Sequence, residues 1–117
     1  MRLNEIQYDD SKPVDSYGPG FFRIGGQMFE GAICAFSGGV APWGGYNDVE
    51  TILTRKDDID VVFVGTGSEI AHLPADFRDA LEEAGLGVEA MASPAACRTY
   101  NVLLSEGRRI AVALIPV

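Results

Sequence analysis

Hydrophobic and polar positions in the second half of the chain alternate between strand-like and helix-like patterns. Continuous apolar runs at residues 60–65 and 109–116 are typical of strands covered on both faces of a sheet. A shorter apolar segment at residues 88–92 also predicts a strand. Residues 74–84 and 93–106 place their apolar positions on one helical face. We therefore predict strand, helix, strand, helix, strand, with the last strand in the centre of the sheet.

Proline and glycine mark the ends of both predicted helices. Pro74 and Pro94 stand at first helical positions, where the missing N–H costs little. Gly85 and Gly107 follow the last turns, where glycine commonly ends a helix. Ser93 is expected to cap the second helix.

Turn signals dominate the first half of the chain. Residues 1–16 are polar and are expected to form a loosely ordered N-terminal segment. Residues 21–29 predict a hairpin, because Gly25 and Gly26 interrupt a strand-like pattern. Residues 31–36 predict a further apolar strand.

A glycine-rich segment connects this strand to the second half. Residues 37–47 are predicted to be a loop, and Asp48 is expected to cap a short helix that ends near Arg55. Together the elements predict an α/β fold in which helices pack on a mixed sheet. The length of 117 residues predicts a single domain over residues 1–117.

Charge narrows the classes of partner. Nine basic residues oppose seventeen acidic ones, so the net charge is −8. Such an acidic chain repels phosphate groups, which argues against sequence-independent binding to nucleic acid and against direct contact with anionic lipid.

The apolar stretches also bear on location. Residues 1–15 contain no apolar run, so we expect no signal peptide and no mitochondrial presequence. The longest apolar stretches are too short to span a bilayer. We expect a bacterial, cytoplasmic protein that reaches the inner membrane only through a partner, without membrane insertion.

Cysteine and histidine are too few for most metal or catalytic sites. Cys34 and Cys97 form no zinc-binding pattern and no disulfide framework, and His72 is the only histidine. A catalytic triad or a multi-histidine metal centre would have to rest on that one residue. We therefore expect no metal and no cofactor.

One candidate ligand site follows the predicted strand at residues 60–65. Gly65, Thr66 and Gly67 lie beyond its carboxyl end, where ligands bind in α/β sheets. Their free N–H groups can hold an anion. Ser93 would add the N-terminus of its helix at the same sheet edge if the two strands are parallel. The alternative is a tight turn that uses the backbone freedom of glycine.

Two residues in the first turns of that helix extend the candidate site. Arg98 can donate two hydrogen bonds to an anion, and Cys97 near a helix N-terminus can have a lowered pKa. A cysteine nucleophile needs a base, and only His72 is available. The alternative role for Cys97 is a small buried residue that faces the sheet. We therefore assign no catalytic residue, and an enzyme is the less favoured interpretation.

Aromatic residues in the glycine-rich segment form a second candidate site. Trp43 and Tyr46 can anchor a partner protein, because aromatic side chains dominate interface energetics. The alternative is that Trp43 folds back onto the sheet and closes the core.

Three segments of the chain carry a resemblance to a known family. They are Tyr17, Gly18, Phe22, Arg23, Ile24 and Gly31; Val64, Gly65, Thr66 and Gly67; and Ala96, Cys97, Arg98, Thr99, Tyr100, Asn101, Glu106, Gly107, Arg108, Ala113, Leu114, Ile115 and Pro116. In order and spacing, over residues 3–117, the chain resembles the family of the mitochondrial respiratory complex I (NADH dehydrogenase) assembly factor 3. That family also holds small bacterial and archaeal proteins of unknown function.

The resemblance implies a three-layer fold, with a central mixed sheet of about five strands and an additional N-terminal β-hairpin layer. It implies no established catalytic activity and no established cofactor. The mitochondrial member binds other assembly proteins and young complex I subunits, which implies protein partners such as components of respiratory-complex or membrane-protein assembly.

Four polar residues of the last segment are expected to be structural. Tyr100 is expected in the core with its hydroxyl hydrogen-bonded, and Asn101 is expected to bond to main-chain groups. Arg108 follows the helix end, where a cation is favourable, and can pair with Glu106.

These observations favour a non-enzymatic protein-binding or assembly factor. The alternative is a protein that binds a small molecule or an anion, an uncharacterised enzyme included. Its site would be formed by residues 65–67 and the N-terminus of the Ser93 helix. A third interpretation places the function in homo-oligomerisation, and the sequence leaves a monomer and a homodimer open.

Overall fold

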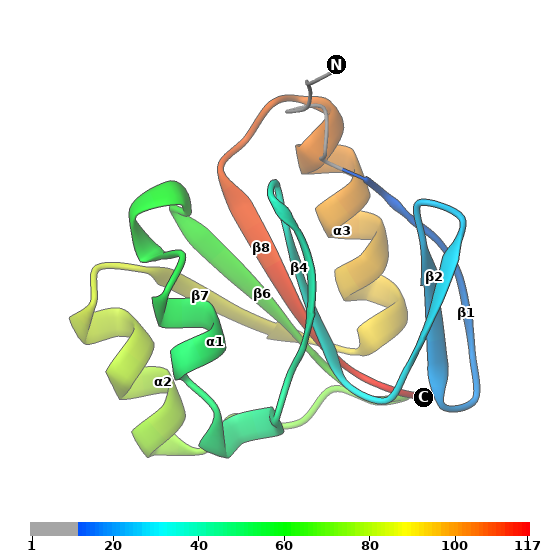
Figure 1. Cartoon of the computed structure of the whole chain (residues 1–117). Helices are drawn as coiled ribbons and strands as arrows, with labels where there is room; N and C mark the ends of the chain where they lie inside the picture. The colour runs from blue at the N-terminus through cyan, green and yellow to red at the C-terminus, as the bar shows by residue number, and fades with distance from the viewer. Residues whose placement is uncertain (1–11) are drawn as a thin grey trace.

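The computed structural model describes residues 12–117, which form three layers (Figure 1). The strands are β1 (Val14–Gly18), β2 (Phe21–Ile24), β3 (Gln27–Glu30), β4 (Ile33–Phe36), β5 (Gly39–Pro42), β6 (Val61–Thr66), β7 (Gly87–Met91) and β8 (Ile110–Ile115). The helices are α1 (Glu50–Leu53), α2 (Ala75–Glu83) and α3 (Ser93–Ser105), with short 3-10 turns η2 (Gly45–Asn47) and η3 (Lys56–Asp58).

The central layer is a five-stranded mixed sheet with the order β5-β4-β8-β6-β7. Strand β8 runs parallel to β6 and antiparallel to β4, which confirms the predicted central position of the last strand. Helices α1 and α2 cover one face of this sheet. Helix α3 and a three-stranded antiparallel sheet, β1-β2-β3, lie on the other face (Figure 1).

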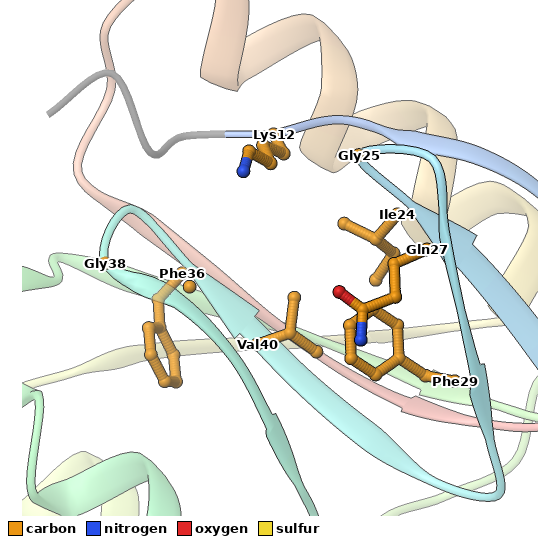
Figure 2. Close-up of a pocket in the computed structure, with 9 residues that line it drawn as sticks. Lys12, Ile24, Gly25, Gln27, Phe29, Phe36, Gly38 and Val40 are labelled. Atoms are coloured by element: carbon orange, nitrogen blue, oxygen red, sulfur yellow. The ribbon is translucent and has the colours of Figure 1, made fainter. Parts of the chain in front are cut away.

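Two hairpins from different layers lie opposite one another, β2–β3 from the outer sheet and β4–β5 from the central sheet (Figure 2). The first turns through Gly25 and Gly26, both with positive φ, at 59° and 83°. This is the geometry that a two-residue hairpin loop requires, and it confirms the predicted hairpin.

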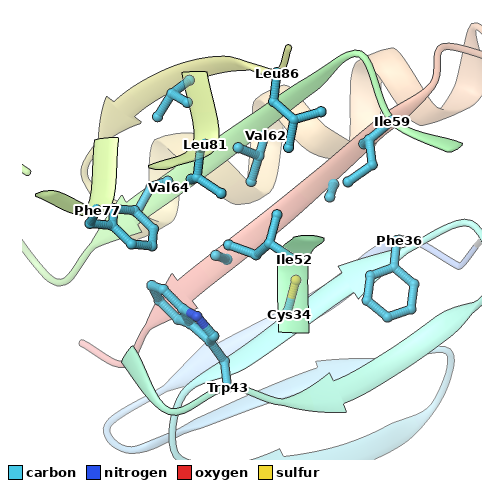
Figure 3. Packing of buried hydrophobic residues seen from close by; sticks show 13 residues of the cluster. Cys34, Phe36, Trp43, Ile52, Ile59, Val62, Val64, Phe77, Leu81 and Leu86 are labelled. Atoms are coloured by element: carbon cyan, nitrogen blue, oxygen red, sulfur yellow. The ribbon is translucent and has the colours of Figure 1, made fainter. Parts of the chain in front are cut away.

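Alternation along β8 divides the core into two clusters. Ala111 and Ala113 point toward α1 and α2, where large side chains such as Trp43 and Phe77 pack (Figure 3). Ile110, Val112 and Leu114 of β8 point toward α3 and the outer sheet. The two alanines therefore match bulky side chains that approach from α2 and from the segment after β5.

The N-terminal layer differs from the prediction. Residues 14–16, expected in a loosely ordered segment, belong to strand β1, so this layer has three strands instead of a hairpin. Residues 1–11 lie outside the described part. Residues 14–16 are ordered by a tertiary contact, because the side chain of Asn101 in α3 binds both main-chain groups of Val14.

The glycine-rich segment also differs. Residues 37–47 were predicted to be a loop, yet they contain β5, which pairs with β4. Glycine and proline have low strand propensity, but pairing with a neighbouring strand overrides propensity. Pro42 is tolerated because β5 is an edge strand, where a missing N–H need not break a ladder.

Candidate functional site

The predicted ligand site lies where β6 ends beside the first turn of α3. The N–H of Gly67 donates to the hydroxyl oxygen of Ser93 at 2.9 Å, and the N–H of Ser93 donates to the carbonyl of Gly67 at 2.7 Å. The Ser93 hydroxyl donates in turn to the carbonyl of Ile115 at 2.6 Å. The structure therefore brings Gly67 and Ser93 together as predicted, because β6 and β7 are parallel.

These groups bind one another instead of facing an open space. A side chain on Gly65 would place its Cβ 2.7 Å from the Ser93 hydroxyl and 2.7 Å from the Cδ2 atom of Leu114. Glycine is therefore needed here for the close approach of α3 to β6. Ser93 is the first residue of α3 and not its cap, which is Ala92, so that expectation was wrong.

Thr66 organises the loop that follows this junction. Its hydroxyl donates to the carbonyl of Glu69 at 2.7 Å and accepts from the N–H of Ala71 at 3.0 Å. The residue between them, Ile70, is 67% exposed. Thr66 thus fixes the loop on both sides of an exposed isoleucine.

Cys97 and Arg98 do not complete an anion site. Cys97 is buried between α3 and the sheet, and this burial raises the pKa of its thiol to about 11 although Arg98 lowers it. Of the two roles considered for Cys97, the structure shows the small buried residue that faces the sheet, and its thiol pKa is not lowered because desolvation outweighs the nearby cation. Arg98 is exposed and lines a shallow depression on the outer side of α3 with Thr99, Val102 and Leu103.

Trp43 belongs to the core and not to an exposed aromatic surface. It is 5% exposed, and its indole N–H donates to the carbonyl of Asp48 at 2.9 Å. Its ring lies 5.9 Å from the rings of Tyr46 and Phe77, which are themselves 5.2 Å apart. The core alternative is therefore the one that the structure shows for Trp43 (Figure 3). Tyr46 is half-buried and packs against it.

The polar residues of the C-terminal segment have separate roles. Asn101 accepts from the N–H of Val14 at 2.8 Å and donates to its carbonyl at 2.9 Å, so it does bond to main chain as expected. Tyr100 is fully buried, but its hydroxyl has no hydrogen-bond partner in the described part of the chain, contrary to expectation. Glu106 and Arg108 are both exposed, and they are not among the ion pairs of residues 12–117.

Sequence reasoning missed a cleft of about 500 Å³ between the two hairpins (Figure 2). It is lined by Lys12, Ile24, Gly25, Gln27, Phe29, Phe36, Gly38, Gly39 and Val40. Its walls come from different layers, so no local pattern could reveal it. The paired glycines of the two turns were the only local signal. Within residues 12–117, no cluster of histidine, cysteine and acidic side chains could hold a metal ion.

Comparisons with known proteins agree with this architecture. Residues 14–115 match the family described as protein of unknown function (DUF498/DUF598). An uncharacterized protein of Rhodobacter capsulatus is 42% identical over 117 residues, which cover 100% of this chain and 94% of that protein. A solved structure, described as an outer membrane protein from Bartonella henselae, has a TM-score of 0.83 at 35% identity, over 91% of this chain and 95% of that one.

An assembly factor is also similar to the chain. The NADH dehydrogenase [ubiquinone] 1 alpha subcomplex assembly factor 3 of Danio rerio is 32% identical over 110 residues. The match covers 88% of this chain but only 63% of the assembly factor. None of the helices described here is long and apolar enough to cross a membrane.

Proposed function

The chain belongs to the DUF498/DUF598 family of proteins of unknown function, and we propose that it is a non-enzymatic protein-binding factor in the assembly of a respiratory NADH dehydrogenase. Two observations support the proposal. The chain is similar to an assembly factor over most of its length, and the edge of the sheet where α/β proteins bind ligands presents an apolar side chain instead of free N–H groups.

Ile70 is the observation that carries the partner surface. It is the most exposed large hydrophobic side chain of the described residues, at 67%. The loop on both sides of it is held by the Thr66 hydroxyl, through Glu69 and Ala71. An anchor that is already ordered loses little conformational entropy on binding, which favours affinity. The loop is therefore suited to insert Ile70 into an apolar pocket of a partner protein.

The experiment compares two variants in a strain of the source organism that lacks this gene. Ile70→Asp places a charge on the proposed anchor. Met28→Asp is the matched control, because Met28 is 48% exposed on the outer sheet, in a different layer. Assembled NADH dehydrogenase is measured by native gel electrophoresis with an activity stain.

We expect wild-type protein and Met28→Asp to restore the assembled complex, and Ile70→Asp to fail while keeping its melting temperature. Equal restoration of the complex by both variants would show that Ile70 is not the anchor. A deletion strain with normal NADH dehydrogenase would contradict the assembly role itself.

The cleft between the hairpins supports a second candidate function, the binding of a small amphipathic anion. Its lining combines apolar side chains such as Ile24, Phe29 and Val40 with the cation Lys12 (Figure 2). Clefts of about this volume commonly bind small molecules. The exposed lining of this cleft is more polar than apolar, which suits the anionic end of such a ligand. The small-molecule alternative therefore moves from the Gly67–Ser93 junction to this cleft.

Thermal shift tests this second function with decanoate and, as its control, decylamine. We expect decanoate to raise the melting temperature of wild-type protein and decylamine to leave it unchanged. Lys12→Glu should abolish the effect of decanoate, and so should Val40→Trp, which fills the cleft. Equal shifts for both compounds would indicate nonspecific hydrophobic binding and contradict the proposal.

A further inference from the structure

The outer face of α3 has an exposed apolar centre. Val102 is 56% exposed, and it lies on the opposite side of the helix from the fully buried Tyr100. A shallow depression of about 420 Å³ beside it is lined by Arg98, Thr99, Val102 and Leu103. An exposed valine at the centre of a helical stripe is a feature that packing within residues 12–117 does not require.

Opposite charges flank this centre at equal distances. Arg98 lies four residues before Val102 and Glu106 lies four residues after it, so all three share one face of the helix. Both charged side chains are exposed, and the ion pairs of residues 12–117 include neither of them. Glu106 is the C-cap of α3, where a negative charge is unfavourable beside the helix dipole.

We propose that this face binds the same face of a second copy of the chain, with the two α3 helices antiparallel and a two-fold axis through Val102. Such an axis places each residue opposite the one equally far on the other side of Val102. The axis therefore brings the two valines together. It also places Arg98 of each copy opposite Glu106 of the other.

The same operation matches the remaining polar residues of the stripe. Thr99 and Ser105 lie three residues before and after Val102, so they too face one another across the axis. An interface between identical copies has to be complementary to itself under a two-fold rotation, and this stripe satisfies that condition in the spacing of its polar residues and in charge. The pairing also supplies each Glu106 with a cation.

The dimer is expected to be weak. The contact runs only from Arg98 to Glu106, which lies one residue beyond the end of α3, and interfaces of this limited extent dissociate readily. Sedimentation equilibrium of the full chain between about 1 μM and about 1 mM covers the corresponding range of dissociation constants.

Charge reversal provides the specific test. Because of the two-fold axis, Arg98→Glu places like charges at two contacts of the dimer, and so does Glu106→Arg. Each single variant should raise the dissociation constant about tenfold or more. The double variant Arg98→Glu/Glu106→Arg should restore dimerisation to near the wild-type value. Arg23→Glu on the outer sheet is the matched control for net charge and should dimerise as wild type.

Three results would overturn the proposal. Wild-type protein that stays monomeric over the whole range would exclude the dimer. A dimer that is insensitive to both single variants would place the interface elsewhere. A double variant that has a wild-type circular dichroism spectrum but remains monomeric would exclude the Arg98–Glu106 contact. The measurement does not depend on the assembly role, so the two proposals can fail separately.

Discussion

Gly67 and Ser93 bond to each other twice, with the Gly67 N–H on the Ser93 hydroxyl at 2.9 Å and the Ser93 N–H on the Gly67 carbonyl at 2.7 Å. They are 26 residues apart and join the end of β6 to the start of α3. Since the Ser93 hydroxyl also donates to Ile115, one buried side chain ties β6, α3 and the end of β8 together. The loop that carries Ile70 begins at this junction.

Ser93→Ala is expected to destabilise the fold by about 1–3 kcal/mol, because it leaves the buried Gly67 N–H and the Ile115 carbonyl without their partner. Urea unfolding followed by circular dichroism measures the change. Ser105→Ala is the control, since the exposed Ser105 hydroxyl donates to the carbonyl of Val102 within its own helix. Similar losses of stability for the two variants would show that the buried Ser93 hydroxyl contributes no more than an exposed helical hydroxyl.

Trp43→Ala is expected to destabilise the fold by about 3–5 kcal/mol, the cost of a large cavity in a core. Trp43 is the only tryptophan, so its fluorescence also reports its environment. We expect blue-shifted emission in the folded protein and a red shift on unfolding. Tyr17→Ala, at a half-exposed aromatic residue, serves as the comparison and should cost much less. Red-shifted native emission would contradict the core position of Trp43.

Tyr100→Phe is expected to leave stability unchanged or to raise it by up to about 1 kcal/mol, because a buried hydroxyl without a partner carries a desolvation cost. Thermal and urea unfolding provide the measurement. A clear loss of stability would mean that the hydroxyl has a hydrogen-bond partner in solution, such as an ordered water molecule.

Stability is expected to fall as the pH rises above about 9. Burial raises the pKa of Cys34 from 9.0 to about 12 and that of Cys97 from 9.0 to about 11. In this range the unfolded chain releases its thiol protons while the folded chain keeps them. The contribution to stability is therefore complete below the unfolded pKa and is lost as the pH rises toward the folded values.

Urea unfolding at about pH 8 and about pH 10 checks this expectation. The wild-type protein should lose more stability between the two pH values than a Cys34→Ala/Cys97→Ala variant. Equal losses would show that other groups cause the pH dependence. Thiol labelling of the native protein should also be slow until urea unfolds it, because both thiols are buried.

Much of the fold follows from the sequence by itself. The apolar runs that became β6 and β8 could be read as buried strands, since residues covered on both faces leave no polar position. Proline and glycine located the ends of α2 and α3 to within a residue or two. These signals are local, because helix ends and turns depend on the backbone preferences of single residues.

Only the tertiary structure decided what the candidate residues do. Strand β1 is attached through Asn101 and Val14, which are 87 residues apart, and β5 depends on pairing with β4. The Gly67–Ser93 junction closed because α3 packs directly on Gly65, and Ile70 in the loop that follows it is exposed. The local sequence pattern identifies the residues that can bind a ligand or a partner. Whether they bind each other instead depends on which distant segments the core brings into contact.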